Sequence, residues 1–505
     1  MFWHPQGFSI TLLTEERSAT ERHNSIQSHP MKHSFKLILL CILWCCCTHL
    51  MASHPFQIRA FHLDFRTQVM TVEAIKSLAT HLSEEGINTL VIEYEATFPF
   101  RENATLSNPY AFKESEVKDI VDHCTELGID VIPLQNCFGH AEYILRHERY
   151  AHLREDNKDM SQVCPSEAGR AVEVFRSIFA DIARLHPSPY IHIGADENRL
   201  LGHCKKCQGK EKSQLFADYL LAMCNIVKSL GKTPIIWADI ILKYPDAIDQ
   251  LPKDLIYVDW NYGWNPNHFG NLDNLIGQGA FMWGAPALRS HPDNFYQIDW
   301  MKHFRNLQTF IPFAREHHYQ GIIETSWSTS GQYGYHYENG FEVQSIQPIR
   351  QVYPMIGCQI LIDAYCQALR QENPLDIECF IKDYGKEKFD LDDTEATAFL
   401  KYFTEGTPLL IEPHKNRKEF AHFRLLYDLS RTQERYRKAL NRLESPEFKA
   451  DQRKVMATEI RDIYRESQRL NQRLRKALKG YLKEGCIEEI IRYKDERLEE
   501  ILRSL

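Results

Sequence analysis

Two neighbouring acidic residues, Asp196 and Glu197, end the short apolar stretch HIGADE. Hydrolysis of a glycosidic bond needs an acid that protonates the leaving oxygen and a group that stabilises positive charge at the anomeric carbon. Adjacent carboxylates on a regular strand face opposite ways, but both can turn toward one substrate where the strand gives way to a loop. Each also suppresses the ionisation of the other, which keeps one protonated. The pair therefore predicts acid–base chemistry at a strand end.

The elements that must position this pair follow from the alternation of short apolar runs with longer amphipathic stretches. Runs such as GINTLVIE and GIDVIPL are typical of parallel strands covered on both faces, and eight strands alternating with helices are what a barrel requires. A doubly wound open sheet is the alternative, but the strand count and the polar or aromatic strand ends favour closure. We predict strands at 57–63, 89–93, 130–134, 190–194, 233–237, 255–259, 280–283 and 321–326, and helices that include 72–85, 114–127, 171–185 and 213–230.

After about residue 372 the pattern changes to long amphipathic helices. One apolar stripe runs from Phe423 to Leu443 and a second from Met456 to Tyr481, with Arg, Lys and Glu on the other faces. Such helices, packed antiparallel, suit a dimerisation or lid element, or an appendage packed on the barrel with a solvated outer face. We favour the appendage and keep a homodimer through these helices as the alternative. The fold class is thus α/β, a (β/α)8 TIM barrel followed by a C-terminal α-helical region.

The amino-acid composition limits the classes of binding partner that suit this chain. The formal net charge of -8 argues against a nucleic-acid partner, because phosphate contacts need clustered Lys and Arg. Eight Trp and 23 Tyr suit a carbohydrate partner, since sugar rings stack their C–H faces on aromatic side chains, although most of these aromatics belong to a core. The sequence indicates no cofactor.

Residues 31–53 have the layout of a secretory signal peptide. Lys32 and Lys36 precede an apolar run from 37 to 47, and small residues follow at Ala52 and Ser53. We expect export to the periplasm or the extracellular space, with a membrane anchor as the alternative. The chain then divides into a leader region at 1–53, a catalytic domain at 54–372 and a helical domain at 373–505.

Cys204 and Cys207 are a close pair of cysteines outside that leader. A structural zinc site needs four ligands, and no second CxxC or HxxxH accompanies this pair. Half of a metal site, a surface disulfide formed after export and two incidental thiols on a βα loop all fit. We therefore assign no metal.

The HIGADE stretch resembles the H-x-G-[AG]-D-E signature of family 20 glycoside hydrolases, the β-N-acetylhexosaminidases. EYEATFPF at 93–100, the stretch 132–156 and HIGADENRLLG at 192–202 resemble hexosaminidase D-type members, and RAFHLD at 59–64 resembles the first strand of the family. The resemblance covers roughly residues 57–370 and implies a retaining, exo-acting, substrate-assisted mechanism. In it the 2-acetamido oxygen of the substrate attacks the anomeric carbon. Asp196 would orient the acetamido N–H, and Glu197 would be the general acid and base.

The resemblance also implies roles for supporting residues. Arg59 would hold sugar hydroxyls, Tyr262 would hydrogen-bond the acetamido carbonyl, and a Glu95–His140–Glu197 relay would tune the proton donor. Four tryptophans close predicted strands and would wall the acetamido pocket, with the last as the floor under the sugar ring: Trp237, Trp260, Trp283 and Trp327.

Two departures concern the recognition of sugar hydroxyls. Many family members carry Glu two positions after the last-strand tryptophan, where this chain has Thr329, and Asp two positions after the tyrosine, where it has Trp264. Glu338 and Glu342 are the candidates to replace these carboxylates. The alternative functions are a catalytically silent glycan-binding barrel and a scaffold built on the C-terminal helices.

Overall fold

The computed structural model describes residues 54–290, 293, 296, 298–328, 353–411, 418–443, 445 and 452–504. The predicted leader at 31–53 and the candidates Glu338 and Glu342 lie outside these residues. The described residues from Pro55 onward form one compact unit.

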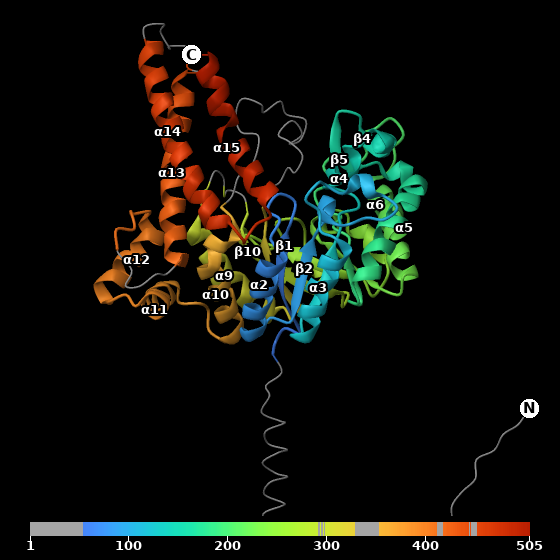
Figure 1. The fold of residues 1–505 in the computed structure, drawn as a ribbon. Helices are drawn as coiled ribbons and strands as arrows, with labels where there is room; N and C mark the ends of the chain where they lie inside the picture. The colour runs from blue at the N-terminus through green and yellow to red at the C-terminus, as the bar shows by residue number, and fades with distance from the viewer. Residues whose placement is uncertain are drawn as a thin grey trace, which may run out of the picture. The chain divides into compact units, whose positions relative to one another are not determined.

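Eight parallel strands close into a barrel (Figure 1). They pair in chain order, and the last pairs with the first in a register that runs from Ile58 opposite Gly321 to Phe61 opposite Glu324. The closed barrel is therefore confirmed over an open sheet, and each predicted strand overlaps an observed one. The strands are β1 (Ile58–Asp64), β2 (Thr89–Glu93), β3 (Asp130–Leu134), β6 (Tyr190–His192), β7 (Thr233–Trp237), β8 (Ile256–Trp260), β9 (Phe281–Ala285) and β11 (Gly321–Ser326).

Three further strands lie outside the barrel ring. β10 (Ala287–Arg289) pairs with β11, and β4 (Arg154–Asp156) pairs antiparallel with β5 (Asp159–Val163) in a hairpin between the helices at Glu142–Leu145 and Ala168–Leu185. The interior of the barrel is filled by aliphatic and aromatic side chains from the strands, among them Val91, Ile132 and Ile235. The barrel is thus a packed core, and only the ends of its strands are available to build a site.

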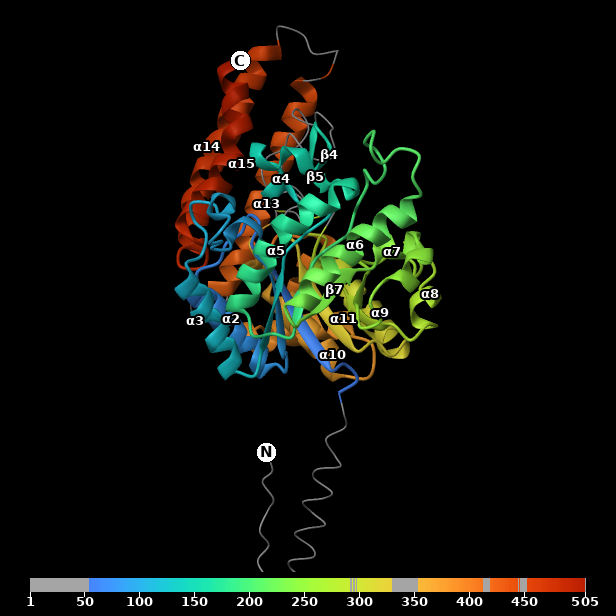
Figure 2. The ribbon, with the colours of Figure 1, turned by 90° about the vertical axis from the view of Figure 1, so that its right-hand side faces the viewer.

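Helices surround the strands (Figure 2). Local signals start two of them, because Thr71 accepts the Ala74 amide at the beginning of α2 and Asp299 accepts the Lys302 amide at the beginning of α9. The helices before residue 372 are α2 (Val72–Glu84), α3 (Glu114–Glu126), α4 (Glu142–Leu145), α5 (Ala168–Leu185), α6 (Lys212–Ser229), α7 (Asp239–Lys243), α8 (Asp273–Ile276), α9 (Trp300–Glu316) and α10 (Gln359–Arg370).

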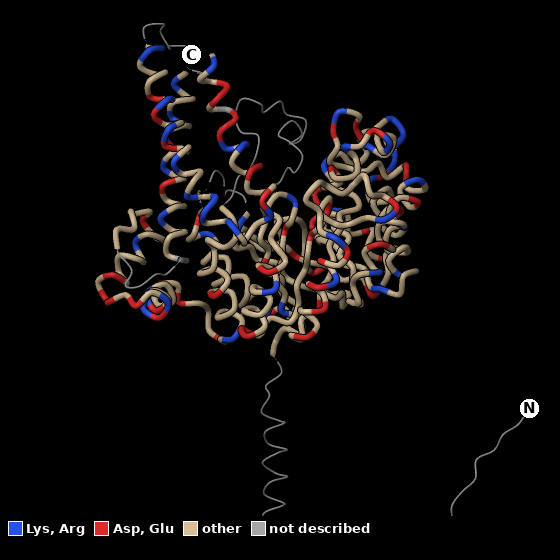
Figure 3. Tube along the Cα trace, in the orientation of Figure 1, with Lys and Arg blue, Asp and Glu red and all other residues tan. Residues whose placement is uncertain are grey.

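Both predicted C-terminal helices are present, and they are antiparallel. Asp428 in the first half of α13 pairs with Arg473 in the second half of α14, and Arg442 near the end of α13 pairs with Glu459 near the start of α14. Their apolar stripes pack against each other and against a third helix, while acidic and basic residues alternate along the three (Figure 3). The C-terminal helices are α11 (Ile377–Phe389), α12 (Asp393–Glu405), α13 (Lys418–Leu443), α14 (Arg453–Leu478) and α15 (Glu484–Ser504).

The C-terminal helices contact the barrel through the segment after β1. Thr71 donates its amide to the Tyr481 carbonyl, and Lys483 donates its amide to the Val69 carbonyl. The predicted boundary at residue 372 stays a prediction. Among the described residues, no helix combines the length and the apolar character that crossing a bilayer requires.

Candidate active site

The acidic pair lies on a turn at the carboxyl end of β6. The strand ends at His192, and Gly194 and Ala195 both have φ of 72° while Glu197 has φ of 48°. This left-handed backbone breaks the strict alternation of side chains along a strand, so Asp196 and Glu197 are no longer forced to opposite faces. Carboxyl ends of barrel strands are where catalytic groups gather.

The side chains of Asp196 and Glu197 converge on one imidazole, that of His140. Its Nε2 lies 3.4 Å from Asp196 Oδ2 and 3.2 Å from Glu197 Oε2. The exposed fractions of the three side chains are 18% for His140, 11% for Asp196 and 30% for Glu197, so the cluster is largely buried yet open to solvent. Three groups that can exchange a proton therefore meet at the mouth of the barrel.

The charges in this cluster shift its pKa values in opposite directions. Burial lowers the pKa of His140, but the charges of Asp196 and Glu197 outweigh that effect and hold the pKa well above its usual value. Burial raises the pKa of Glu197, but His140 and an ion pair with Arg199 at 2.9 Å outweigh it and lower that pKa to about 2. Without substrate and at neutral pH, the proton shared by His140 and Glu197 accordingly resides on His140.

Asp239, at the start of α7, fixes the backbone of the acidic pair. Its Oδ2 accepts the amide of Glu197 at 3.0 Å. Burial, and then the charge of Asp196, raise the pKa of Asp239 to about 7. A third carboxyl group thus binds the backbone of the pair, and its pKa lies near neutral pH.

The predicted contact of Glu95 with His140 is wrong. Glu95 is buried, and its Oε1 accepts a hydrogen bond from Asn136 Nδ2 at 3.0 Å, while the same nitrogen donates to Glu93 Oε1 at 2.8 Å. Burial and the charge of Glu93 raise the pKa of Glu95 well above its usual value. The partner of Glu95 is therefore Asn136 and not His140, and His140 contacts Glu197 without Glu95.

Three of the predicted tryptophans and Tyr262 form a connected aromatic group. Trp327 Nε1 donates to the hydroxyl oxygen of Tyr262 at 2.7 Å, and the ring centroids of Trp327 and Trp237 are 5.7 Å apart. Trp260 lies with its ring centroid 5.2 Å from that of Tyr262. These residues come from the ends of β7, β8 and β11, so the structure brings them together at the same end of the barrel as the acidic pair.

The prediction for Trp283 is wrong. This tryptophan is opposite Gly321, the first residue of β11, and its ring packs on Tyr190, the first residue of β6, with centroids 5.7 Å apart. Because both neighbours begin their strands, Trp283 fills the amino-terminal end of the barrel interior. It belongs to the core, on the side away from the acidic pair.

The prediction for Arg59 is wrong for the same reason. Arg59 is the second residue of β1, and its guanidinium donates to the carbonyls of Gly86 at 2.7 Å and Phe56 at 3.0 Å. These contacts lie at the amino-terminal end of the barrel. Arg59 therefore cannot contact a substrate held by Glu197.

Arg66, which the sequence analysis missed, lies just past the carboxyl end of β1. It donates to both carboxylate oxygens of Asp64, at 3.1 and 3.0 Å, and its Nε lies 3.6 Å from Glu93 Oε1. Its guanidinium carbon is 5.3 Å from the ring centroid of Trp327. Burial raises the pKa of Asp64, but Arg66 outweighs it and holds that pKa well below its usual range.

Four residues of the site were thus missed: Arg66, Asn136, Arg199 and Asp239. Arg66, Asn136 and Asp239 come two residues past the carboxyl ends of β1, β3 and β7, and Arg199 lies in the loop after β6. The rule that singled out Asp196 could have found them, had it been applied to each predicted strand end.

Comparison with known proteins is consistent with this geometry. Residues 56–275 match the model of the glycosyl hydrolase family 20 catalytic domain. The chain is 28% identical to human hexosaminidase D over 302 residues, which cover 56% of this chain and 62% of the human protein. It is 26% identical to bovine hexosaminidase D over 292 residues, which cover 53% of this chain and 84% of the bovine protein.

Among solved structures, the chain is similar to a β-N-acetylhexosaminidase from Bacteroides fragilis NCTC 9343. The TM-score is 0.47 at 19% identity, and the match covers 66% of this chain and 70% of that one.

Proposed function

We propose that this protein is a retaining exo-β-N-acetylhexosaminidase that uses the acetamido group of its substrate as the nucleophile, a proposal supported by the match of residues 56–275 to the glycosyl hydrolase family 20 catalytic domain. The observation that carries the proposal is the convergence of Asp196 and Glu197 on the imidazole of His140 at the barrel mouth. The substrates are carbohydrates with a terminal β-linked N-acetylglucosamine or N-acetylgalactosamine.

Asp196 is the residue that orients the acetamido group. Its Oδ1 is buried and has no hydrogen-bond partner among the described residues, while its Oδ2 lies beside His140. A buried carboxylate oxygen without a partner is costly, and the acetamido N–H of a bound substrate would supply one. The negative charge of Asp196 would then balance the positive charge of the oxazolinium ion that forms as the acetamido oxygen attacks C1.

Glu197 is the residue that moves the proton. The proton held on His140 Nε2 in the free site passes to Glu197 Oε2, 3.2 Å away, and then to the glycosidic oxygen as the bond to C1 breaks. Glu197 is then a carboxylate that removes a proton from the water attacking C1, and two inversions at C1 give net retention. Tyr262, oriented by Trp327, would donate its hydroxyl proton to the acetamido carbonyl.

An assay with aryl glycosides tests this function. The wild-type chain should release the aryl group from an N-acetyl-β-glucosaminide or N-acetyl-β-galactosaminide and leave the corresponding β-glucoside almost untouched, because the glucoside lacks the internal nucleophile. Glu197→Gln should lower turnover of poorly activated substrates by roughly 10²–10⁴-fold, and Asp196→Asn should lower it comparably. Glu211→Gln, at an exposed carboxylate before α6, is the matched control.

Equal cleavage of the β-glucoside would refute the substrate-assisted mechanism. Release no faster than by the Glu197→Gln variant would leave the glycan-binding alternative.

We also propose that the protein is exported through the segment at 31–53 and that its C-terminal helices are an appendage packed on the barrel, with a homodimer through these helices as the alternative. The supporting observation for export is the basic, apolar and small-residue pattern of that segment. Amino-terminal sequencing of secreted protein that starts after residue 53 would support cleavage, and retention of the segment in a membrane fraction would favour the anchor.

A further inference from the structure

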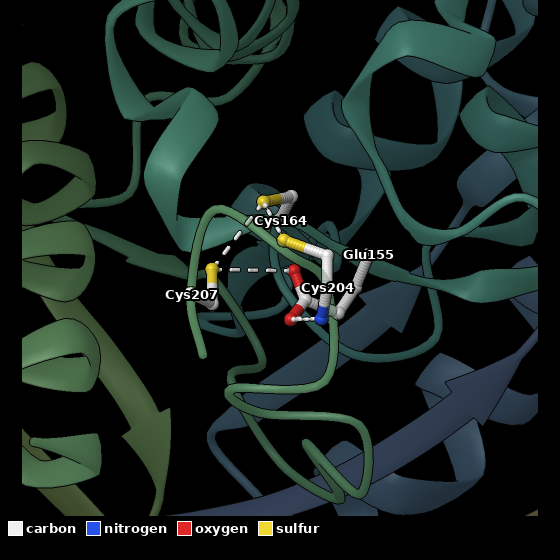
Figure 4. Close-up of side chains that lie close together, drawn as sticks. All are labelled: Glu155, Cys164, Cys204 and Cys207. Carbon is white, nitrogen blue, oxygen red and sulfur yellow. Dashed lines mark hydrogen bonds between the residues drawn. The ribbon is translucent and has the colours of Figure 1, made fainter. Parts of the chain in front are cut away.

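Four side chains of metal-ligand type meet beside the active-site loop: Glu155, Cys164, Cys204 and Cys207 (Figure 4). They come from β4, from the residue after β5 and from the loop between β6 and α6. Their ligand atoms all lie within 4.8 Å of one another. Cys204 and Cys207 are the close pair that the sequence analysis left without a second pair of ligands, and the fold supplies the missing two.

The spacing of these atoms fits a tetrahedral ion. Cys164 Sγ lies 3.5 Å from Cys204 Sγ and 3.6 Å from Cys207 Sγ, and Cys207 Sγ lies 3.5 Å from Glu155 Oε2. Zinc binds thiolate sulfur at about 2.3 Å and carboxylate oxygen at about 2.0 Å, so tetrahedral ligands stand about 3.8 Å apart for two sulfurs and about 3.5 Å for sulfur and oxygen.

Glu155 provides an independent reason for a cation. It is only 2% exposed, and among the residues that the structure describes no Lys, Arg or His forms an ion pair with it. One of its oxygens, Oε1, accepts the amide of Cys204 at 2.9 Å, which turns the other oxygen toward the sulfur of Cys207. A buried carboxylate is stable when it is paired or coordinates a metal, and this one is aimed at thiols.

We propose that Glu155, Cys164, Cys204 and Cys207 bind one zinc ion. Three thiolates select a cation that prefers sulfur, and one carboxylate with three thiolates matches zinc better than the hard cations that need oxygen ligands. Four protein ligands leave no position for water or substrate, so the ion is structural. The prediction that the chain holds no metal rested on counting ligands along the sequence, and Cys164 is 40 residues from Cys204.

The ion would fasten two segments that carry the proposed proton pair. Within the β4–β5 hairpin, Ser161 accepts the amide of Ala141, the residue after His140, at 2.9 Å. Gln162 Oε1 accepts the amide of Leu200, next to the Arg199 that pairs with Glu197, at 2.8 Å. The zinc would therefore fix the distance between His140 and Glu197. This consequence for catalysis rests on the proposed function, but the binding of zinc does not.

Metal analysis of the purified full-length chain tests the site. Mass spectrometry of metals should find about one zinc per chain in the wild type and in Cys379→Ser, a control at an exposed cysteine of α11. The double variant Cys204→Ser/Cys207→Ser should contain far less. Cobalt bound in place of zinc should show the visible absorption of a tetrahedral thiolate complex in the wild type, and a chelator should lower the melting temperature of the wild type.

Three results would overturn the proposal. One is equal zinc content in the wild type and the double variant. Another is a wild type that binds neither zinc nor cobalt after reduction and incubation with the metal. The third is a Cys164–Cys204 or Cys164–Cys207 disulfide in the native protein whose reduction does not restore metal binding. Disulfides form in exported proteins, so such a bond is the main alternative to zinc. If the double variant does not fold, the test is the cobalt spectrum of the wild type before and after alkylation of its thiols. The thiolate absorption should be lost on alkylation. An inactive glycosidase that still holds zinc would contradict the proposed function alone.

Discussion

At the scale of single residues, the imidazole of His140 controls the charge of the acidic pair. It lies within 3.4 Å of both carboxylates, its pKa is held well above its usual value, and the pKa of Glu197 is about 2. A general acid with so low a pKa cannot hold its own proton at neutral pH. The His140–Glu197 pair is therefore active in catalysis only while it holds a proton. That form persists until the pH exceeds the raised pKa of His140.

His140→Asn tests this dependence. Loss of the imidazole removes the main influence that lowers the pKa of Glu197, so that pKa rises and the proton resides on the carboxyl group alone. Since a carboxylic acid still loses its proton at lower pH than the raised imidazolium, the alkaline limb of kcat/KM should move to lower pH. A pH–rate profile of both proteins measures the shift, and an unchanged alkaline limb would contradict the shared proton.

The two arginines of the first strand region provide a second test at this scale. We expect Arg66, at the barrel mouth, to hold a sugar hydroxyl in the role that the sequence assigned to Arg59. Arg66→Lys should therefore raise KM by roughly 10–100-fold, the effect of losing one charge-assisted hydrogen bond to the sugar of about 1.5–3 kcal/mol. Arg59→Lys is the matched control at the opposite end of the barrel and should leave KM nearly unchanged. Steady-state kinetics on the same aryl glycoside decide, and a larger effect at Arg59 would restore the original assignment.

At the scale of elements, the strand ends depart from regular backbone where the site is built. Glu95, His140, Ala195 and Glu197 all have positive φ, and they follow β2, β3 and β6. Non-glycine residues adopt this conformation at an energetic cost, which neighbouring contacts must offset. The loops hold these residues by close packing, and that packing makes them sensitive to small additions of volume.

Gly139→Ala tests this packing. A Cβ built on Gly139 would lie 2.1 Å from the carbonyl oxygen of Asp196, so the loop that carries the acidic pair must move. We expect a large fall in kcat/KM with a lower melting temperature. Gly169→Ala is the matched control, because its Cβ meets nothing within 4 Å and it lies in α5, where alanine is the better helix former. Equal activity of the two variants would show that the loop tolerates displacement.

At the scale of the whole described molecule, the C-terminal helices support the segment that follows β1. Cys486 donates its thiol to the Thr67 carbonyl at 2.7 Å, and Thr67 donates its hydroxyl to Ser328 at 3.1 Å. Ser328 in turn donates its amide to Asp64, the partner of Arg66, at 2.7 Å. A chain of hydrogen bonds thus runs from α15 to the arginine at the barrel mouth.

Truncation after residue 372 removes this support. We expect a lower melting temperature and a higher KM, because the segment that positions Arg66 loses its partners. Light scattering of the full and truncated chains at the same concentration tests the alternative of a homodimer through these helices. A truncated chain with unchanged stability, kinetics and mass would show that the helices serve neither role.

The sequence alone determined the features that depend on local pattern. Strand runs with few polar residues gave the eight barrel strands to within a few residues, and amphipathic spacing gave α13 and α14, because burial of a strand or a helix face imposes its own period. The pair at Asp196 and Glu197 was visible because the residues are adjacent in the chain. The domain boundary at 372 and the leader stay predictions.

The tertiary structure decided everything that depends on which end of the barrel a residue occupies and on contacts between distant segments. Arg59 and Trp283 lie at the amino-terminal end, where the pairing of β11 with β1 and with β9 places them, and Arg66 lies at the other end. Cys164 meets Cys204 only because the β4–β5 hairpin folds back over the loop after β6. Such contacts leave no period in the sequence, because the residues that make them are joined by packing and not by spacing.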